Sequence, residues 1–367
     1  MQLVQPTSER LIAEPGPSHF AEGLPTAPRC YREQPQRALN REWKQGWIAR
    51  AMVPVSLWAG HRLADSVGIL MYHRIARPIP QGEPPTWNVT PARLRAQLQG
   101  LLELGFRAWP LSKVIEHHQS RRPIPRRTFV VTFDDGYENL FTQAWPVLRD
   151  LAVPATIFLA TAYLDSLQPF PFDDWTLAGQ RHVPADAWRP LTTAQCEQLL
   201  TTGLVELAAH THSHADFRHC QSRFPGDIEH CRQLLQQRFG IDRPAFAFPY
   251  GCKKSGFVTP ELVHWVRRSQ FACGLTTESD VVRLGQDPYD WGRFTAYESD
   301  SALTLASKLD GWYSLACEKL RLVRMALGRP WSWQNFADTR EIALGRYGEP
   351  AERTLARVSD RQGGDHA

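Results

Sequence analysis

The chain has 367 residues, of which 43% are hydrophobic and 22% are charged, and its net charge is +4. This balance is typical of a soluble globular protein with a sizeable core, so extensive disorder is not expected. This net positive charge is too small to indicate nucleic-acid binding by itself. The seven scattered cysteines favour free thiols over a disulfide framework.

Residues 1–62 are interpreted as an N-terminal extension of the main domain. Their first part, to about position 40, is rich in proline, glycine and serine and predicts a partly disordered leader. No basic stretch is followed by an apolar one there, so no signal peptide is expected. The favoured location is therefore the cytoplasm or the inner face of the membrane.

The stretch from Trp47 to Gly60 is the most apolar part of this extension. Arg50 and Pro54 interrupt it, and no run in the chain reaches the roughly 18–20 apolar residues that a membrane span requires. A helix packed on the outside of the following domain is the favoured interpretation. The alternative is a peripheral helix at a membrane surface, with Trp47 and Trp58 as interfacial anchors.

Short apolar runs alternate with helical patterns from residue 63 to about residue 300. Predicted strands cover 68–73, 128–133, 155–161, 205–210, 245–248 and 271–277. Predicted helices cover 91–105, 138–151, 196–203, 227–240 and 261–270, with Pro146 bending or shortening the second. This alternation indicates βαβ units and a parallel sheet, either open and doubly wound or closed as a barrel near the (β/α)8 type. Residues 301–367 predict a helical C-terminal segment.

Four of the predicted strands end in reactive or turn-forming residues. The first ends at His73, the second runs into Asp134 and Asp135, and the fourth runs into His210. The fifth runs into the sequence Pro-Tyr-Gly at 249–251. Because the carboxyl ends of parallel strands open onto one rim of a barrel, these groups are expected to lie together at a site.

The adjacent carboxylates of Asp134 and Asp135 have two interpretations. Asp135 and Gly136 resemble an Asp-Gly turn that only reverses the chain. A bound cation would instead relieve the repulsion between the two carboxylates, with one binding the metal and the other free for proton transfer.

Three histidines occupy alternate positions at 210, 212 and 214. His210 and His214 are four residues apart, so one turn of helix would place both imidazoles on one face. Two histidines with one carboxylate form a common open coordination set for zinc or a similar divalent ion. His210, His214 and Asp135 are therefore the expected ligands, and His212 is expected to be solvated or to lie behind them.

These motifs together resemble the polysaccharide deacetylase family, the NodB-homology group of carbohydrate esterase family 4. The resemblance rests on TFDDG at 132–136, H-T-x-x-H at 210–214 and FAFPYG at 246–251, and extends over roughly residues 70–296. The segments ILMYHRI, LAVPATIFLAT and FACGLTT resemble the bacterial branch with a Tyr-His-Arg opening. The resemblance implies a deformed (β/α)7 barrel.

The resemblance also implies a reaction and its main residues. Asp134 would be the general base, while Asp135, His210 and His214 would hold a divalent metal, with Zn²⁺ expected and other transition metals open. The substrate would be an N-acetylated amino sugar of a polysaccharide or glycolipid, from which acetate is released.

Further groups complete the expected site. The backbone N–H of Tyr250 would stabilise the oxyanion, and Pro249 and Gly251 would shape the turn that presents it. Asp174 and Trp175, in a loop after the third strand, are candidates for binding the sugar, although an ordinary surface loop is the slightly favoured interpretation.

Two family motifs are altered in this chain. Many members carry an arginine two residues before the proline of the third motif, where this sequence has Ala247, and Arg293 is the expected replacement. Many also have a late Leu-x-His that supplies a general acid, which is missing here. His73 is the candidate for that role, with a water molecule or a purely structural histidine as alternatives.

Three functions remain compatible with the sequence. An N-deacetylase of amino sugars is favoured. The same fold and metal would also suit an O-acetyl ester or another small amide, and the altered motifs leave room for a degenerate carbohydrate-binding relative. The sequence does not indicate an oligomeric state.

Overall fold

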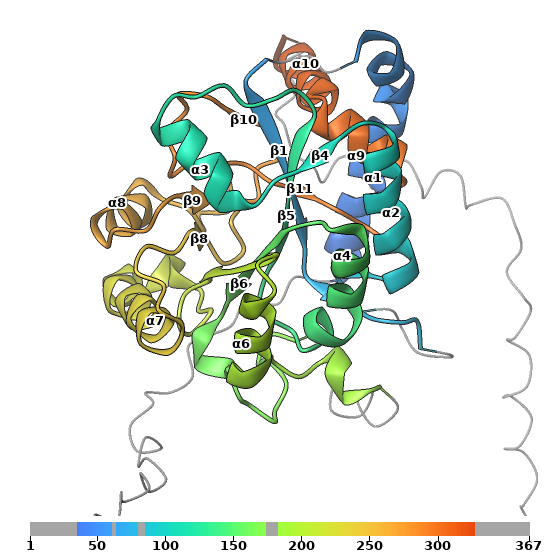
Figure 1. Ribbon diagram of the computed structural model, residues 1–367. Coiled ribbons are helices and arrows are strands. Elements are labelled where there is room, and N and C mark those ends of the chain that lie inside the picture. The colour runs from blue at the N-terminus through green and yellow to red at the C-terminus, as the bar shows by residue number, and fades with distance from the viewer. Residues whose placement is uncertain (1–34, 61–63, 80–84, 174–182, 327–367) are drawn as a thin grey trace, which may run out of the picture. The chain divides into compact units, whose positions relative to one another are not determined.

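The computed structural model describes residues 35–60, 64–79, 85–173 and 183–326, which include a barrel of parallel strands with helices outside it (Figure 1). The barrel strands are β1 (Ser66–Tyr72), β5 (Thr128–Phe133), β6 (Ala155–Leu159), β7 (Val205–Ala209), β8 (Phe246–Ala247), β9 (Gly274–Leu275) and β11 (Phe294–Thr295). Shorter strands are β2 (Arg74–Ile75), β3 (Asn88–Val89), β4 (Arg107–Ala108) and β10 (Val282–Arg283).

The strands form a nearly closed circuit. Neighbours run in the order β1, β5, β6, β7, β8 and β9, all parallel, and β11 pairs in parallel with the other edge of β1. Leu275 in β9 forms a parallel bridge with Trp291, just before β11, which closes the gap. The structure therefore excludes the open doubly wound sheet and agrees with the expected (β/α)7 barrel.

Side chains along the strands point alternately into the barrel and toward the helices, so two hydrophobic cores form. Val130 of β5 and Ala208 of β7 belong to the inner cluster, whereas Val131 and Ala209 belong to the larger outer cluster under the helices. Strands β1, β5 and β6 are buried along their whole length, which is typical of parallel strands covered on both faces. Since side chains alternate between faces, residues 134 and 210 continue the inward-facing series of these two strands.

The predicted helices are present in the predicted order with small shifts, and α3 (Leu111–Gln119) is a further helix that was not predicted from the sequence. The predicted ones are α2 (Pro91–Glu103), α4 (Trp145–Leu151), α6 (Thr193–Thr201), α7 (Phe224–Phe239), α8 (Pro260–Arg268) and α9 (Ala302–Leu309). The helix predicted over 138–151 is divided. A π-helical turn η1 (Leu140–Ala144) precedes α4, and Pro146 falls in the first turn of α4, where its missing N–H costs nothing.

The N-terminal extension holds more structure than its composition indicates. Helix α1 (Pro35–Ala59) begins at residue 35, so the expectation of a loose leader is wrong for 35–40. The helix packs against α9, as the favoured interpretation of the apolar stretch expected, and Ala49 is fully buried. Residues 1–34 lie outside the described part.

The C-terminal segment expected from residue 301 begins with α9 and continues with helix α10 (Trp312–Ala326). Glu318 is the last residue of the compact unit that contains the barrel. The boundaries expected at residues 62 and 300 stay predictions. None of the helices in the described ranges combines the length and apolarity that a membrane span requires.

Candidate active site

The site is assembled where β1, β5 and β7 end. β1 and β5 pair in register from Val67 and Thr128 to Tyr72 and Phe133. The next backbone step continues this pairing, because the N–H of Asp134 donates to the carbonyl of Tyr72 at 3.0 Å. The residues that follow these strands therefore emerge side by side, as the barrel argument predicted.

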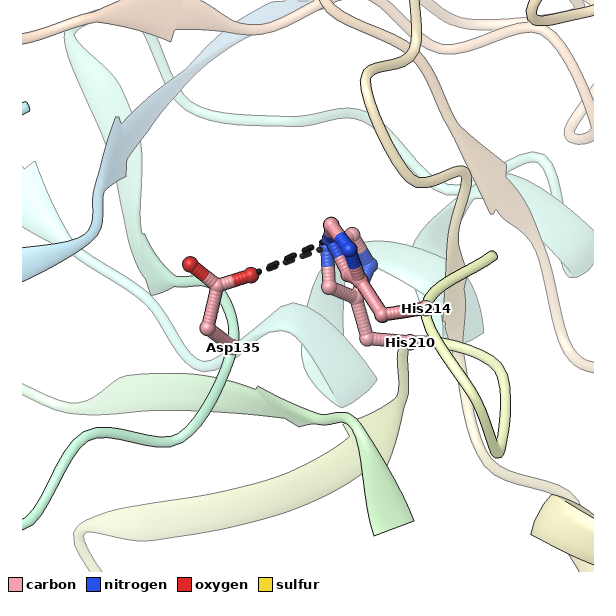
Figure 2. Close-up of side chains that lie close together, drawn as sticks. All are labelled: Asp135, His210 and His214. Carbon is pink, nitrogen blue, oxygen red and sulfur yellow. Dashed lines mark ion pairs between the residues drawn. The ribbon is translucent and has the colours of Figure 1, made fainter. Parts of the chain in front are cut away.

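Asp135, His210 and His214 converge on one point (Figure 2). Oδ1 of Asp135 lies 3.5 Å from Nε2 of His210 and 3.3 Å from Nε2 of His214. All three side chains are buried, and the ligand atoms lie within 4.8 Å of one another. One carboxylate oxygen and two imidazole nitrogens facing a common centre suit a divalent transition metal with open positions for water and substrate.

The Asp-Gly sequence is both a turn and a part of this site. Asp135 and Gly136 adopt positive φ angles of 71° and 89°. A Cβ on Gly136 would lie 2.7 Å from Cδ2 of Leu159, so only glycine fits this turn without strain or collision. The turn aims the Asp135 carboxylate across the rim, so the two interpretations of the sequence are compatible.

A loop, rather than a helical turn, brings the two histidines together, so that expectation is wrong. Thr211 and His214 adopt positive φ angles of 63° and 52°. Oγ1 of Thr211 accepts the N–H of His214 at 2.9 Å, and the Asp227 carboxylate accepts the N–H of His212 at 2.6 Å. These side-chain acceptors replace the backbone acceptors of a helix.

The orientation of the His210 ring is fixed by its Nδ1 nitrogen, on the side away from Asp135. Nδ1 lies 2.8 Å from the carbonyl of Ala247. A carbonyl can only accept, so Nδ1 carries a proton and Nε2 faces Asp135 with its lone pair when the ring is neutral. Burial lowers the pKa of His210, but Asp134 and Asp135 outweigh it and raise the pKa. The two carboxylates thus favour a positive charge here, as a proton or as a metal ion in its place.

His214 lies between the cavity and an aromatic wall. Its ring stacks on Phe172 with centroids 3.9 Å apart, and the ring of Tyr250 meets it edge-on at 4.9 Å. Burial lowers the pKa of His214 despite the nearby Asp135 carboxylate, so the ring is neutral at neutral pH. Nδ1 is buried and has no hydrogen-bond partner among the described residues. A neutral imidazole with Nε2 toward Asp135 fits a metal ligand.

Asp134 is held by a buried arginine. Nη1 and Nη2 of Arg293 donate to Oδ1 and Oδ2 of Asp134 at 2.6 and 2.7 Å, and the arginine is fully buried. Burial alone would raise the pKa of the Asp134 carboxyl, but the guanidinium outweighs it and the pKa lies below its ordinary value. The arginine expected to replace the missing family residue therefore lies against Asp134, and its role stays a prediction.

His73 follows β1 and lines the same cavity. Its ring stacks on Trp87 with centroids 5.5 Å apart, and its Nδ1 is buried without a hydrogen-bond partner in the described part of the chain. Burial lowers the pKa of His73, although Asp135 and Asp134 act to raise it. The position suits proton transfer to a leaving group, and the choice between that role and a structural one stays open at this stage.

The turn after β8 forms another wall. Tyr250 and Gly251 have positive φ angles of 61° and 49°, and Pro249 before them is buried. A Cβ on Gly251 would lie 2.8 Å from the backbone nitrogen of Thr277, so the turn requires glycine. Tyr250 lines the cavity, and the assignment of its N–H to an oxyanion stays a prediction.

Sequence reasoning singled out the loop after the third strand but missed the contact that holds it over the site. Arg74, next to His73, donates to the Asp173 carboxylate at 2.5 Å and to the Tyr137 hydroxyl at 3.1 Å, and all three side chains are buried. This contact ties the loop that carries Phe172 to the end of β1. The pattern Tyr-His-Arg was the only signal for Arg74, and nothing in the sequence pairs it with Asp173. Asp174 and Trp175 lie outside the described residues.

His212 points away from the site, as expected for the residue between two ligands. Its ring stacks on His230 of α7 with centroids 4.0 Å apart, and its Nδ1 lies 3.0 Å from Oγ1 of Thr161. It lines a separate surface cavity beside α7. The cavity at the site has a volume of about 130 Å³ and is lined by Asp134, Asp135, His73, His210 and His214.

Comparisons with known proteins show which proteins this chain is similar to. Residues 121–259 match the family model described as polysaccharide deacetylase. The chain is 24% identical over 267 residues to the poly-β-1,6-N-acetyl-D-glucosamine N-deacetylase of Staphylococcus epidermidis, covering 68% of this chain and 84% of the relative. It is 30% identical over 124 residues to the enzyme of the same name from Escherichia coli K12, covering 34% of this chain but only 18% of that longer relative.

Solved structures show the same fold. IcaB from Ammonifex degensii superposes with a TM-score of 0.55 and 21% identity, covering 66% of this chain and 97% of the other. The Streptococcus pyogenes deacetylase PplD, solved in complex with acetate, superposes with a TM-score of 0.55 and 18% identity, covering 67% of this chain and 99% of the other. Both likenesses support the deformed barrel.

Proposed function

Because the barrel of this chain belongs to the polysaccharide deacetylase family, we propose that it is a divalent-metal-dependent hydrolase that removes acetyl groups from the N-acetylglucosamine units of a polysaccharide. One observation carries the proposal. Oδ1 of Asp135 lies 3.3–3.5 Å from the Nε2 atoms of His210 and His214. The Asp134 carboxylate, which a buried arginine keeps ionised, lies directly beside this cluster. A metal centre and a base on one cavity are what hydrolysis of an amide requires.

The relatives narrow the substrate. The curated relatives described above are named as acting on poly-β-1,6-N-acetyl-D-glucosamine, and one of them aligns with 68% of this chain. We therefore assign the same β-1,6-linked polymer to this chain. The cavity is bordered by Trp87, Phe172 and Phe257, and flat aromatic faces of this kind pack well against sugar rings.

The metal would be held by the three ligand side chains, with zinc the ion that suits the donor set best. When bound, it would supply Lewis-acid polarisation and lower the pKa of a water molecule at the site. The chain's own contribution is orientation. The Ala247 carbonyl fixes the His210 tautomer, and the turn at Gly136 fixes the direction of the Asp135 carboxylate.

Asp134 acts as the general base in this proposal. Its carboxylate is ionised at neutral pH because Arg293 keeps its pKa low, and Oδ2 lies 4.0 Å from Nε2 of His210, close to the metal position. It therefore accepts the proton of the attacking water as the carbon–oxygen bond forms at the acetyl carbonyl.

His73 delivers a proton to the departing amine in this proposal. It is the remaining histidine of the cavity once the two ligands are assigned. The carbon–nitrogen bond breaks as the amine takes up that proton, leaving acetate and a glucosamine unit. Burial lowers the pKa of His73, which favours release of a proton to the amine, and the proton that Asp134 takes from the attacking water balances the one that His73 gives up.

Acetate release tests the proposal directly. The metal content of the full chain is measured after purification. The chain is then incubated with β-1,6-linked and β-1,4-linked N-acetylglucosamine oligomers and with an O-acetylated sugar. We expect acetate from the β-1,6 series, loss of activity with chelator, and loss in Asp135→Ala. Release from the ester alone would replace the N-deacetylase with an esterase. A chain that binds the oligomer but holds no stoichiometric metal would be a carbohydrate-binding relative, and the proposal would fail.

The cellular location expected from the sequence, the cytoplasm or the inner face of the membrane, stays a prediction.

A further inference from the structure

Helix α1 exposes a row of tryptophans that the proposed reaction does not use. The side chains of Trp43, Trp47 and Trp58 are 57%, 62% and 90% exposed, and Leu57 beside them is 61% exposed. At 3.6 residues per turn, positions 43, 47 and 58 fall within about 60° of one another around the helix. Three large aromatic side chains on one face mark an interaction surface rather than scattered surface residues.

The other face of α1 is fixed to the barrel. Ala49 is fully buried, and its carbonyl accepts the Ser307 hydroxyl of α9 at 2.9 Å. The Ser56 hydroxyl donates to the Asp310 carboxylate at 2.5 Å. One face of the helix is therefore packed on the barrel, and the tryptophans lie on a different face.

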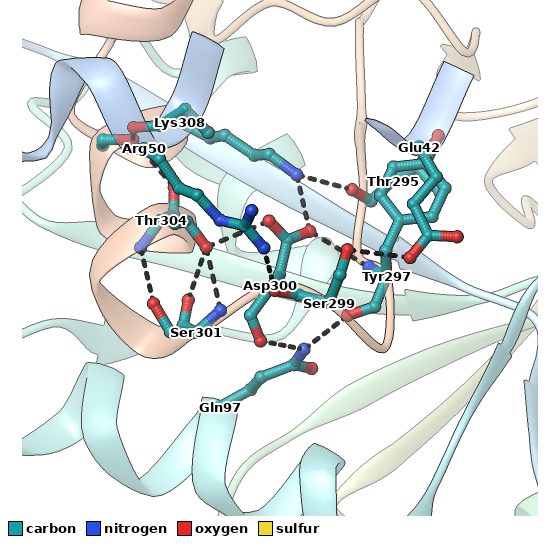
Figure 3. A network of polar contacts seen from close by, with 12 residues as sticks. Glu42, Arg50, Gln97, Thr295, Tyr297, Ser299, Asp300, Ser301, Thr304 and Lys308 are labelled. Atoms are coloured by element: carbon teal, nitrogen blue, oxygen red, sulfur yellow. Dashed lines mark hydrogen bonds and ion pairs between the residues drawn. The ribbon is translucent and has the colours of Figure 1, made fainter. Parts of the chain in front are cut away.

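A polar network anchors the middle of α1 at the same side (Figure 3). The hydroxyl of Ser299 donates to Glu42 at 2.7 Å, and the carbonyl of Ser299 accepts Nη2 of Arg50 at 3.3 Å. Next in the chain, Asp300 forms a buried ion pair with Lys308 at 2.7 Å. This network holds α1 in a fixed rotation, which keeps the tryptophan face turned outward.

The charge of α1 indicates what this face binds. By sequence, α1 contains four basic residues and one acidic residue, Glu42, whose carboxylate accepts the Ser299 hydroxyl. A second copy would bring two positively charged helices together, which is unfavourable. An anionic lipid surface attracts the basic residues, while tryptophan rings prefer the boundary between headgroups and acyl chains. A concave pocket of the kind that binds small molecules is not formed by a convex helix face.

We propose that α1 docks the barrel onto the surface of an anionic membrane, with Trp43, Trp47 and Trp58 in the headgroup region. The helix lies on the membrane and does not cross it, in agreement with the absence of a spanning helix among the described residues. This inference does not depend on the proposed deacetylation, because lipid binding and acetate release are measured separately.

Cosedimentation with vesicles tests the inference. The full chain is mixed with vesicles of phosphatidylglycerol and phosphatidylethanolamine, and with neutral phosphatidylcholine vesicles, over a range of salt concentrations. Wild type is expected to bind the anionic vesicles, less tightly as salt rises. The triple variant Trp43→Ser, Trp47→Ser, Trp58→Ser is expected to bind about tenfold or more weakly, because it loses the interfacial anchors.

Two further variants make the result interpretable. Leu167→Ser removes another strongly exposed apolar side chain, 72% exposed and outside α1, and is expected to bind like wild type. Trp58→Ser alone changes a side chain that is 90% exposed, and is expected to weaken binding several-fold even if the triple variant misfolds. The proposal is overturned if the wild type does not bind anionic vesicles, or if the tryptophan variants bind them as tightly as the wild type does. It is also overturned if those variants only convert a dimer into a monomer in light scattering.

Discussion

Replacing Arg293 by alanine tests whether this arginine controls the ionisation of Asp134. Arg293 donates two hydrogen bonds of 2.6 and 2.7 Å to the carboxylate, and the two side chains are 0% and 3% exposed. Without the arginine, a buried carboxylate is left unpaired, which destabilises a protein by about 3–5 kcal/mol. Asp134 is also expected to lose its function as a base, which lowers acetate release by about 10²–10⁴-fold.

The dependence of this loss on pH identifies its cause. In wild type the pKa of Asp134 is depressed, so the pair stabilises the fold above the ordinary aspartate pKa and this contribution is lost as pH falls through the depressed value. In Arg293→Ala only His210 and His73 still oppose the effect of burial, so the pKa of Asp134 is expected to rise and the variant to lose stability as pH rises. The difference in unfolding free energy should therefore be largest near neutral pH and shrink toward about pH 4.

Urea denaturation of the metal-free proteins at several pH values measures this difference, and acetate release measures activity. The matched control is Arg267→Ala. Arg267 donates two hydrogen bonds to Asp287, but both side chains are about half exposed, so the loss should be only about 0–1 kcal/mol and should change little with pH. If Arg293→Ala destabilises equally near neutral pH and at about pH 4, the arginine is only a packing group and the argument fails.

Four further predictions follow from the site. Asp135→Ala should weaken zinc binding by more than the roughly 100-fold that is lost when a hydrogen-bond partner of a metal ligand is removed. Dialysis followed by elemental analysis measures the bound zinc, and a variant that keeps stoichiometric zinc would contradict the prediction. The affinity of the wild type for zinc should fall as pH falls, because the raised pKa of His210 lets a proton compete with the metal. Competition with a zinc-chelating dye at several pH values measures this affinity, and an affinity that does not change with pH would contradict the prediction. His73→Ala should lower kcat by about 10²–10⁴-fold while leaving bound zinc unchanged, and unchanged turnover would make the histidine structural. Gly136→Ala should cost about 1–3 kcal/mol in thermal or urea unfolding, since φ is 89° and the new Cβ would meet Leu159, and a neutral effect would show that the turn can shift.

The barrel and the clustering of Asp135 with His210 could be predicted because each depends on a local pattern. Continuous apolar runs give parallel strands, and whatever follows such a strand lies at the shared rim, which placed Asp135 and His210 together before any coordinates were known. The position of His214 was correct for the wrong reason. A spacing of four residues suits a helix, but the loop reaches the same result through positive φ angles at Thr211 and His214. Such angles are not visible in sequence spacing.

Contacts between distant segments were beyond sequence reasoning. The pair of Arg74 and Asp173 joins positions 99 residues apart, and the stacking of Phe172 on His214 depends on how that loop folds back. Neither has a periodic signal. The helical start of α1 at Pro35 was also hidden, because its stability comes from burial of Ala49 against α9 rather than from a strong local pattern.

The position of Arg293 explains how a chain with Ala247 in the third motif can still hold the Asp134 carboxylate. Ala247 is fully buried in the inner cluster, and its carbonyl is engaged by His210. The guanidinium instead enters from the segment just before β11, the strand that lies beside β1 and therefore close to the end of β5. What the chemistry requires is a buried, bidentate donor at the Asp134 carboxylate, and the closed barrel allows more than one strand to supply it. A sequence motif records the strand that supplies the arginine, whereas the physical constraint is the pair of hydrogen bonds to Asp134.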